Sequence, residues 1–334
     1  MHSWFLGNSG DGALVICTMK GAEKIERIGF ACVLSDGSLT TNHGFILRFL
    51  GETRIAEAIQ QNLDDLERIL FQLSSGPLRQ FRLGSSLIPF ASHPAFNPEW
   101  YRFAAGRLER IGRYWTDRGF RFSMHPGQYT ILNSPNPVVV SAAIAEIDYA
   151  ATVLDFMGLD ESHRIVVHGG GIYGDRVGST ERLISQLHEL PEKLRRRLVL
   201  ENDERQFNLE QILEVAEAAK LPVVFDLHHF QINPSPDLAG LLERVRDTWP
   251  CRPKVHLSSQ RPNARIGTHD DLIHREDLEE MCRVLPFSAD LMIEAKAKEI
   301  AALQVADWLR RTREQGSPRN ASATPLSMQT TYRS

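Results

Sequence analysis

The chain has 334 residues, 42% of them hydrophobic, which is enough apolar material to fill one large core. The 38 Lys and Arg residues nearly balance the 42 Asp and Glu residues, and the formal net charge is −4. This balance argues against a protein whose whole surface binds nucleic acid, but it allows a local basic groove. The four cysteines (Cys17, Cys32, Cys251 and Cys282) form no CxxC pair, so we expect reduced thiols in a cytoplasmic protein without disulfides. No apolar run approaches the length of a membrane span, so we expect neither a secretory signal nor a membrane anchor.

Eight short apolar or β-branched runs are predicted to be strands. In chain order they occupy residues 26–33, 81–89, 121–126, 164–170, 198–203, 222–229, 254–259 and 290–296. Between them, apolar residues recur three and four positions apart, which predicts amphipathic helices over 54–73, 99–115, 138–158 and 208–219. Gly119 and Gly158 stand where helix C-caps belong, and Asn208 stands where an N-cap belongs.

This alternation of strand and helix predicts parallel strands joined by right-handed crossovers. Eight such units close into a single-domain α/β fold, the (β/α)8 TIM barrel, which we assign to residues 26–312. An open doubly wound sheet is the alternative, but "VHGGGIYG" lacks the spacing and the partner acid of a dinucleotide loop, so no nucleotide cofactor is expected. Residues 1–25 are interpreted as an N-terminal extension, and the polar segment 313–334 as a disordered tail.

Imidazoles and carboxylates gather at the predicted carboxyl ends of the strands, which in a barrel face one mouth. They are His125, His168, Glu201, Asp226, His228, His229, His256 and Glu294, with His93 and His269 in the loops after the second and seventh strands. One such histidine is typically structural, but six consecutive strands with these groups are hard to explain by packing, because uncompensated charges resist burial. Divalent cations remove that difficulty, and the ligand types favour Mn, Zn, Fe or Co over Mg or Ca. The number of ligands implies two or three ions.

Clustered ions of this kind activate a water and stabilise both the attacking and the leaving oxygen in phosphoester hydrolysis, and they also serve sugar isomerases. The sixth strand leaves a choice open. Strict alternation places Asp226 and His228 on one face and His229 on the other, whereas a bend after Leu227 would turn His229 inward. Residues beside the ligands are candidates for orienting them: Asn202, Asp203 and Ser258.

Eight motifs, in order, resemble those of the UV damage endonucleases, the ATP-independent DNA-repair nucleases of the UvdE type. They read "RLGSSLIP", "SMHPGQYTILNSP", "VVHGGGIYGD", "LENDE", "VFDLHH", "VHLSS", "THDDLI" and "DLMIEAKAKE". The resemblance implies a TIM barrel related to the barrel apurinic endonucleases, with a cluster of Mn²⁺ ions. The ligands it implies are His125, His168, Glu201, Asp226, His229, His256, His269 and Glu294, so it selects His229 over His228. Lys254 matches a family lysine that is found carboxylated near the metals, and it joins His256 and Glu294 as a catalytic candidate.

The same resemblance implies contacts with DNA. Gln128 and Tyr129 match a pair that probes the damaged site, and His93 matches a further histidine near the metals. Phe30 stands where the family usually has a tyrosine on the DNA side, so it is a candidate DNA contact that lacks the hydroxyl. His43 stands where the family has an arginine, so a phosphate contact is expected to be weaker there. The implied activity is a cut in double-stranded DNA immediately 5′ to a UV photoproduct, leaving a 3′-hydroxyl, by a monomeric enzyme. The alternatives are an apurinic-site endonuclease of the same barrel class, a divalent-metal sugar isomerase or epimerase, and a non-catalytic damage-binding protein.

Overall fold

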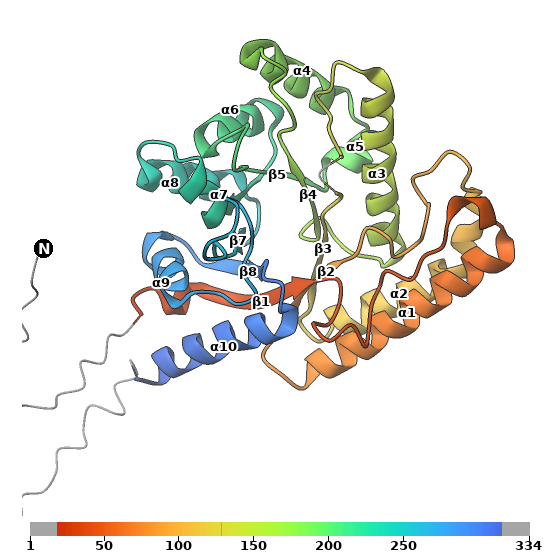
Figure 1. Cartoon of the computed structure of the whole chain (residues 1–334), viewed down its shortest axis with the longest axis horizontal. Helices are drawn as coiled ribbons and strands as arrows, with labels where there is room; N and C mark the ends of the chain where they lie inside the picture. The colour runs from red at the N-terminus through yellow and green to blue at the C-terminus, as the bar shows by residue number, and fades with distance from the viewer. Residues whose placement is uncertain (1–18, 128, 316–334) are drawn as a thin grey trace, which may run out of the picture.

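The structure is a computed structural model that describes residues 19–127 and 129–315, and its centre is a closed barrel of parallel strands (Figure 1). The strands within the described residues are β1 (Ile25–Ala31), β2 (Gln80–Leu83), β3 (Arg121–Met124), β4 (Arg164–His168), β5 (Leu198–Glu201), β6 (Val223–Asp226), β7 (Lys254–Leu257) and β8 (Ala289–Ile293). Each strand pairs in parallel with the next, and β1 also pairs with β8. The predicted single-domain TIM barrel is therefore confirmed.

The helices form an outer layer around the strands (Figure 1). They are α1 (Glu52–Ser74), α2 (Ala105–Thr116), α3 (Pro137–Phe156), α4 (Arg176–Glu189), α5 (Glu192–Arg195), α6 (Leu209–Ala219), α7 (Leu227–Ile232), α8 (Leu238–Thr248), α9 (Arg275–Val284) and α10 (Lys298–Gln315), with 3-10 turns η1 (Ala22–Lys24), η2 (Leu47–Phe49) and η3 (Pro98–Phe103). The predicted caps are confirmed. Asn208 and Gln211 form a capping box at the start of α6, and Gly119 and Gly158 adopt positive φ angles of 80° and 67° just after α2 and α3.

The strands are shorter at their carboxyl ends than the sequence predicts. The sixth ends at Asp226 rather than at 229, and the second ends at Leu83 rather than at 89. The apolar runs continue beyond the hydrogen-bonded ladder into the loops of the mouth, where burial no longer requires strand geometry. In the ladder itself, His168 pairs in register with Glu201, and Asp226 with His256. Side chains from neighbouring strands therefore reach the mouth at one level.

The folded body extends a few residues beyond the predicted boundaries at 26 and 312. At the start, Ala22 and Ile25 are buried in the core. At the end, α10 continues to Gln315, and the Arg313 guanidinium donates a hydrogen bond of 2.8 Å to the Ala22 carbonyl. The rest of the predicted extension and tail, residues 1–18 and 316–334, lies outside the described residues.

Among the described residues, one helix, α3, is long and apolar enough to cross a membrane by length and composition. The expectation that no apolar run approaches a membrane span is therefore wrong for this segment. Its apolar character has a packing explanation, because Ala143, Ile147 and Leu154 are buried in the core. A core helix of a soluble protein passes the same test, so α3 is weak evidence for a membrane protein.

Candidate metal centre

Seven of the eight predicted ligands come together in three groups that share one carboxylate, Glu201 of β5. Each group offers ligand atoms that all lie within 4.8 Å of one another, and the groups are His125–His168–Glu201, Glu201–His256–Glu294 and Glu201–Asp226–His229. The eighth, His269, lies outside these groups, with its ring 6.5 Å from that of His229. The arrangement fits several cations placed around one central carboxylate better than it fits a single ion.

Glu201 is fully buried and is surrounded by imidazoles. Its Oε1 accepts a hydrogen bond of 2.7 Å from Nδ1 of His256, and its Oε2 lies 3.1 Å from Nε2 of His125 and 3.8 Å from Nε2 of His168. Burial raises the pKa of Glu201, but the nearby histidines outweigh burial and lower that pKa well below its ordinary value. Glu201 is therefore an ionised carboxylate in a dry site.

Several buried polar atoms in this cluster have no hydrogen-bond partner among the described residues. They are Nδ1 of His125 and His168 and Oδ2 of Asp226. A buried carboxylate oxygen without a donor is costly, and a divalent cation would satisfy it. The imidazole and carboxylate donors fit Mn, Zn, Fe or Co, so the residues present fit the predicted metals.

The sixth strand resolves the choice between the two adjacent histidines. β6 ends at Asp226, whose side chain caps α7 by accepting a hydrogen bond of 2.8 Å from the backbone N–H of His229. The helical turn places Nδ1 of His229 3.8 Å from carboxylate oxygens of both Glu201 and Asp226. His228 is buried elsewhere, with its ring 5.6 Å from that of His269. The chain thus turns His229 inward, and strict strand alternation fails at this point.

Asn202 holds this turn in place. Its amide group exchanges two hydrogen bonds with the Asp226 backbone, of 3.0 and 2.9 Å, and its backbone carbonyl accepts a 2.9 Å bond from Nδ1 of His229. That bond leaves Nε2 of His229, which lies 3.8 Å from Oε2 of Glu204, as the ring nitrogen open to a cation. Of the other two candidates for orienting ligands, Asp203 instead caps the loop after β5 by accepting from the Phe207 backbone, and the Ser258 hydroxyl has no hydrogen-bond partner within the described residues.

Asp226 and His229 form a coupled acid–base pair. Burial raises the pKa of Asp226 to about 7. Burial lowers the pKa of His229, but Asp226 and Glu201 more than reverse this effect and raise it to about 9. A proton therefore stays with this pair near neutral pH, and a cation that binds both side chains must displace it.

Arg82 of β2 is part of the site, although the sequence analysis gave it no role. Its Nη2 donates hydrogen bonds of 2.6 Å to Oε1 of Glu294 and 3.0 Å to Nε2 of His256. Burial raises the pKa of Glu294, but Arg82 and then His256 outweigh burial and hold that pKa well below its usual range. A charged residue inside the apolar "FRLGSSLIP" run was the available signal, because a charge in a buried strand requires a partner.

Lys254, at the start of β7, is fully buried, and its Nζ has no hydrogen-bond partner in the part of the chain that the structure describes. Burial, together with the cationic side chains of Arg121 and Arg82, lowers the pKa of Lys254 well below its ordinary value. The uncharged amine is the nucleophilic form of lysine, and it is the form that reacts with carbon dioxide. The environment of Lys254 is therefore compatible with the carboxylated lysine that the resemblance implies.

The model of the family UV-endonuclease UvdE matches residues 49–321. The chain belongs to this family. The UV DNA damage endonuclease of Clostridium perfringens (strain 13 / Type A) is 34% identical over 291 residues, covering 85% of this chain and 71% of that protein. The UV DNA damage endonuclease of Bacillus mycoides (strain KBAB4) is 32% identical over 261 residues, covering 76% and 82%.

Solved structures give the same result. The crystal structure of SacUVDE aligns with a TM-score of 0.82 at 33% identity, covering 86% of this chain and 99% of that chain. Endonuclease IV from Thermus thermophilus aligns with a TM-score of 0.54 at 16% identity, over 87% of this chain and all of that one (100%), and this likeness shows the shared fold alone.

Of the two predicted DNA-probing residues of this family member, the structure describes Tyr129, in the loop after β3. Tyr129 is 81% exposed, so its ring is free to contact a partner, and Gln128 lies outside the described residues. His93 is exposed in the loop after β2, where its Nδ1 accepts a 3.1 Å hydrogen bond from the Ala95 backbone, and it belongs to none of the three ligand groups. Its predicted place near the metals stays a prediction.

The two departures from the family pattern have different outcomes. Phe30 is completely buried and packs edge-on against Phe81, with ring centroids 5.5 Å apart, so its assignment as a DNA contact is wrong. A phenyl ring at this position is satisfied by core packing, which needs no hydroxyl. His43 lies 2.9 Å from Asp65 through its Nε2, so an acidic side chain already engages the group that stands in place of the arginine. This pairing agrees with a weaker phosphate contact there.

Proposed function

We propose that this endonuclease cuts double-stranded DNA immediately 5′ to UV photoproducts and leaves a 3′-hydroxyl, using two or three divalent ions with Mn²⁺ preferred. Family membership makes the chain a phosphodiester hydrolase of DNA repair. The observation that carries the finer proposal is the sharing of Glu201 by three groups of potential ligands at the barrel mouth. We further propose that it acts as a monomer in the cytoplasm, without a nucleotide cofactor.

The side chains at the mouth have separate tasks in this proposal. The residues that would hold the ions are His125, His168, Glu201, Asp226, His229, His256 and Glu294, with His269 as a further candidate. When bound, such ions supply an activated water and neutralise the charge that develops on the phosphate. Arg82 fixes the position of Glu294 through its 2.6 Å hydrogen bond. Lys254, as a carbamate, would add one more carboxylate, and ¹³C NMR after growth with labelled bicarbonate tests this modification directly.

Lesion recognition follows from stacking energies in the same proposal. A photodimer is already poorly stacked, so extruding it costs less than extruding a normal pair. An exposed aromatic ring such as Tyr129 can fill the vacated stack, where base–aromatic contacts contribute about 1–3 kcal/mol per base. Selectivity for damage then needs no reading of the base sequence.

The decisive experiment compares three duplexes of one sequence: undamaged, with a single photodimer, and with a single abasic site. We expect nicking of the photodimer duplex at the bond immediately 5′ to the lesion, with a 3′ end that a polymerase extends. Glu201→Gln is the matched control, because it keeps the size of the central ligand and removes its charge. Nicking of the abasic duplex alone would favour the apurinic-site endonuclease, and no nicking of any duplex would refute the proposal.

Two further measurements test the rest of the proposal. If no nucleotide cofactor is needed, the nicking rate should be the same with and without added ATP. Sedimentation in solution tests whether the protein is a monomer.

A further inference from the structure

The segment between β1 and α1 exposes an unusual run of large apolar side chains. Ile46 is 54% exposed, Leu47 42% and Phe49 53%, and the Arg48 guanidinium lies 4.7 Å from the centre of the Phe49 ring. Figure 1 shows this segment, in red-orange, running from the end of β1 to the start of α1. Contiguous exposed apolar groups mark interaction sites on proteins. We call these four residues the apolar platform.

The apolar platform rests on a fixed base. Asn62 of α1 is buried, and its side chain accepts a 2.7 Å hydrogen bond from the His43 backbone and donates one of 3.1 Å to the Leu87 carbonyl. The Phe45 ring packs against Phe90, with centroids 5.3 Å apart. The loops after β1 and β2 are therefore locked to each other and to α1. Exposed groups on a fixed base lose little conformational entropy when a partner binds.

The apolar platform lies on the same face as the candidate metal centre. It follows the carboxyl end of β1 and precedes the start of α1, and in a barrel this position belongs to the mouth. A hollow of about 630 Å³ begins at Phe45, the residue just before the platform, and Phe90, Gly127 and Tyr129 also line it. The loop that carries the platform and the exposed Tyr129 thus border one hollow.

We propose that the apolar platform is a second DNA-contacting surface beside the lesion, an inference that rests on the proposed function. Ile46, Leu47 and Phe49 pack against sugars and unstacked bases of the distorted duplex, and Arg48 faces the phosphates. Three features favour DNA as the occupant: the position at the mouth, the hollow that Tyr129 borders together with Phe45, the residue just before the platform, and the Arg48 guanidinium, which has no ion-pair partner among the described residues.

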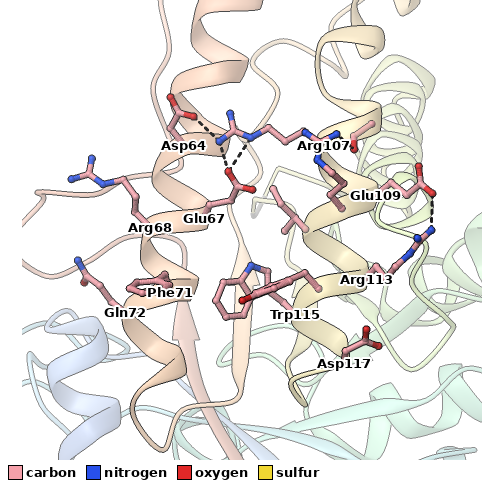
Figure 2. A pocket seen from close by; sticks show the side chains of 14 residues that line it. Asp64, Glu67, Arg68, Phe71, Gln72, Arg107, Glu109, Arg113, Trp115 and Asp117 are labelled. Atoms are coloured by element: carbon pink, nitrogen blue, oxygen red, sulfur yellow. Dashed lines mark hydrogen bonds and ion pairs between the residues drawn. The ribbon is translucent and has the colours of Figure 1, made fainter.

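The test uses Phe49→Ala with a matched control, Phe71→Ala, because both replace an exposed phenylalanine. Phe71 is 71% exposed on α1, in a groove between α1 and α2 where Arg107 pairs with Glu67 and Trp115 forms the wall (Figure 2). It lies near the end of α1 that is remote from the mouth, three residues before the helix ends at Ser74. Binding is measured by fluorescence anisotropy on duplexes with and without one photodimer, at one salt concentration.

We expect Phe49→Ala to weaken binding of the photodimer duplex by about 5- to 150-fold, the range for loss of one base–aromatic contact. Phe71→Ala should stay within about twofold of the wild type, as exposed substitutions away from a site do. Arg48→Ala should also reduce the slope of log affinity against log salt by about one unit, since one phosphate contact is lost. Bound Mn²⁺ and thermal stability should match the wild type in all three variants.

Three outcomes are informative in different ways. Wild-type affinity in Phe49→Ala, with a wild type that nicks the photodimer duplex, overturns this inference and leaves the proposed function standing. A wild type that neither prefers nor nicks the photodimer duplex overturns the proposed function itself. A wild type that sediments as a dimer, while Phe49→Ala sediments as a monomer with unchanged DNA affinity, identifies the apolar platform as a contact between two copies and also overturns the inference.

Discussion

Replacing Arg82 by methionine should reveal how much the Arg82 guanidinium stabilises the buried negative charge of the candidate metal ligand Glu294. The Arg82 side chain is 8% exposed and the Glu294 side chain 15%, with 2.6 Å between Nη2 and Oε1. For charge centres about 4 Å apart, the attraction is about 4 kcal/mol at an effective dielectric constant near 20. Removing one partner of a buried pair typically costs about 3–5 kcal/mol, because the other charge is left unpaired. Methionine keeps most of the apolar stem, so we expect a loss of about 3–5 kcal/mol in the free energy of unfolding of the metal-free protein.

Metal binding should reverse much of that loss. The guanidinium also donates to Nε2 of His256, whose Nδ1 is held by Glu201, so both ring nitrogens of His256 are engaged. A cation near Glu294 supplies the positive charge that Arg82→Met removes. Arg82→Met should therefore be far less stable than the wild type in chelator and close to it in Mn²⁺.

The assay is urea denaturation followed by circular dichroism, with chelator or with Mn²⁺. Arg121→Met is the matched control, because Arg121 forms a buried 2.8 Å pair with Asp290 at the amino end of the barrel, and its hydrogen bonds reach none of the histidines and carboxylates of the three ligand groups. Its loss of stability should be the same in both conditions. A loss below about 1 kcal/mol for Arg82→Met in chelator would show that the pair has little energetic weight. A loss unchanged by Mn²⁺ would place Glu294 beyond the reach of the metals.

Four further predictions concern the activity and the loading of the site. Chelation should abolish nicking, and Mn²⁺ should restore it better than Mg²⁺ because imidazoles dominate the ligand set; equal rescue in a plasmid assay would contradict the proposed site. Glu294→Gln should leave the circular dichroism spectrum unchanged and slow single-turnover nicking by orders of magnitude, whereas a rate within about tenfold of the wild type would remove Glu294 from the cluster. Tyr129→Ala should lower the preference for a photodimer duplex over an undamaged one by about 5- to 150-fold at wild-type metal content, and an unchanged preference would remove Tyr129 from lesion recognition. The pKa of Asp226 is raised to about 7 and that of His229 to about 9, so a cation that binds both side chains must displace their protons. The Mn²⁺ affinity measured by calorimetry should therefore rise from pH 6 to pH 9, and an affinity that does not change with pH would exclude this pair as ligands.

The parts of the site that the sequence predicted are those that follow from periodicity. Short apolar runs alternating with amphipathic segments specify a barrel, and a barrel brings all carboxyl ends of strands to one mouth. His168 and Glu201 then lie side by side because β4 and β5 pair in parallel in that register. No tertiary information is needed for this step beyond the order of the elements.

The parts that the sequence did not predict depend on where a strand stops and on which side chains meet across the barrel. The inward turn of His229 requires the strand to end at Asp226, and the local signal was the aspartate itself, an N-cap residue before "LHH". The role of Arg82 requires contact between β2 and residues of β7 and β8, and periodicity within one strand carries no information about that contact. Phe30 was misplaced for the same reason, since burial against Phe81 depends on the register between β1 and β2.

The distribution of charge inside the barrel argues that this interior is built for function at some expense of stability. TIM barrels usually fill their interior with branched apolar residues. Here Lys254 is buried without a hydrogen-bond partner among the described residues, and both polar atoms of the buried Gln80 amide are likewise unpaired. Each such group costs about 1–3 kcal/mol relative to a satisfied one. Above them, Arg82 compensates Glu294, and the imidazoles of the mouth surround Glu201. Valine and leucine would serve stability better in this layer, so its polar groups carry a cost in stability that packing does not explain.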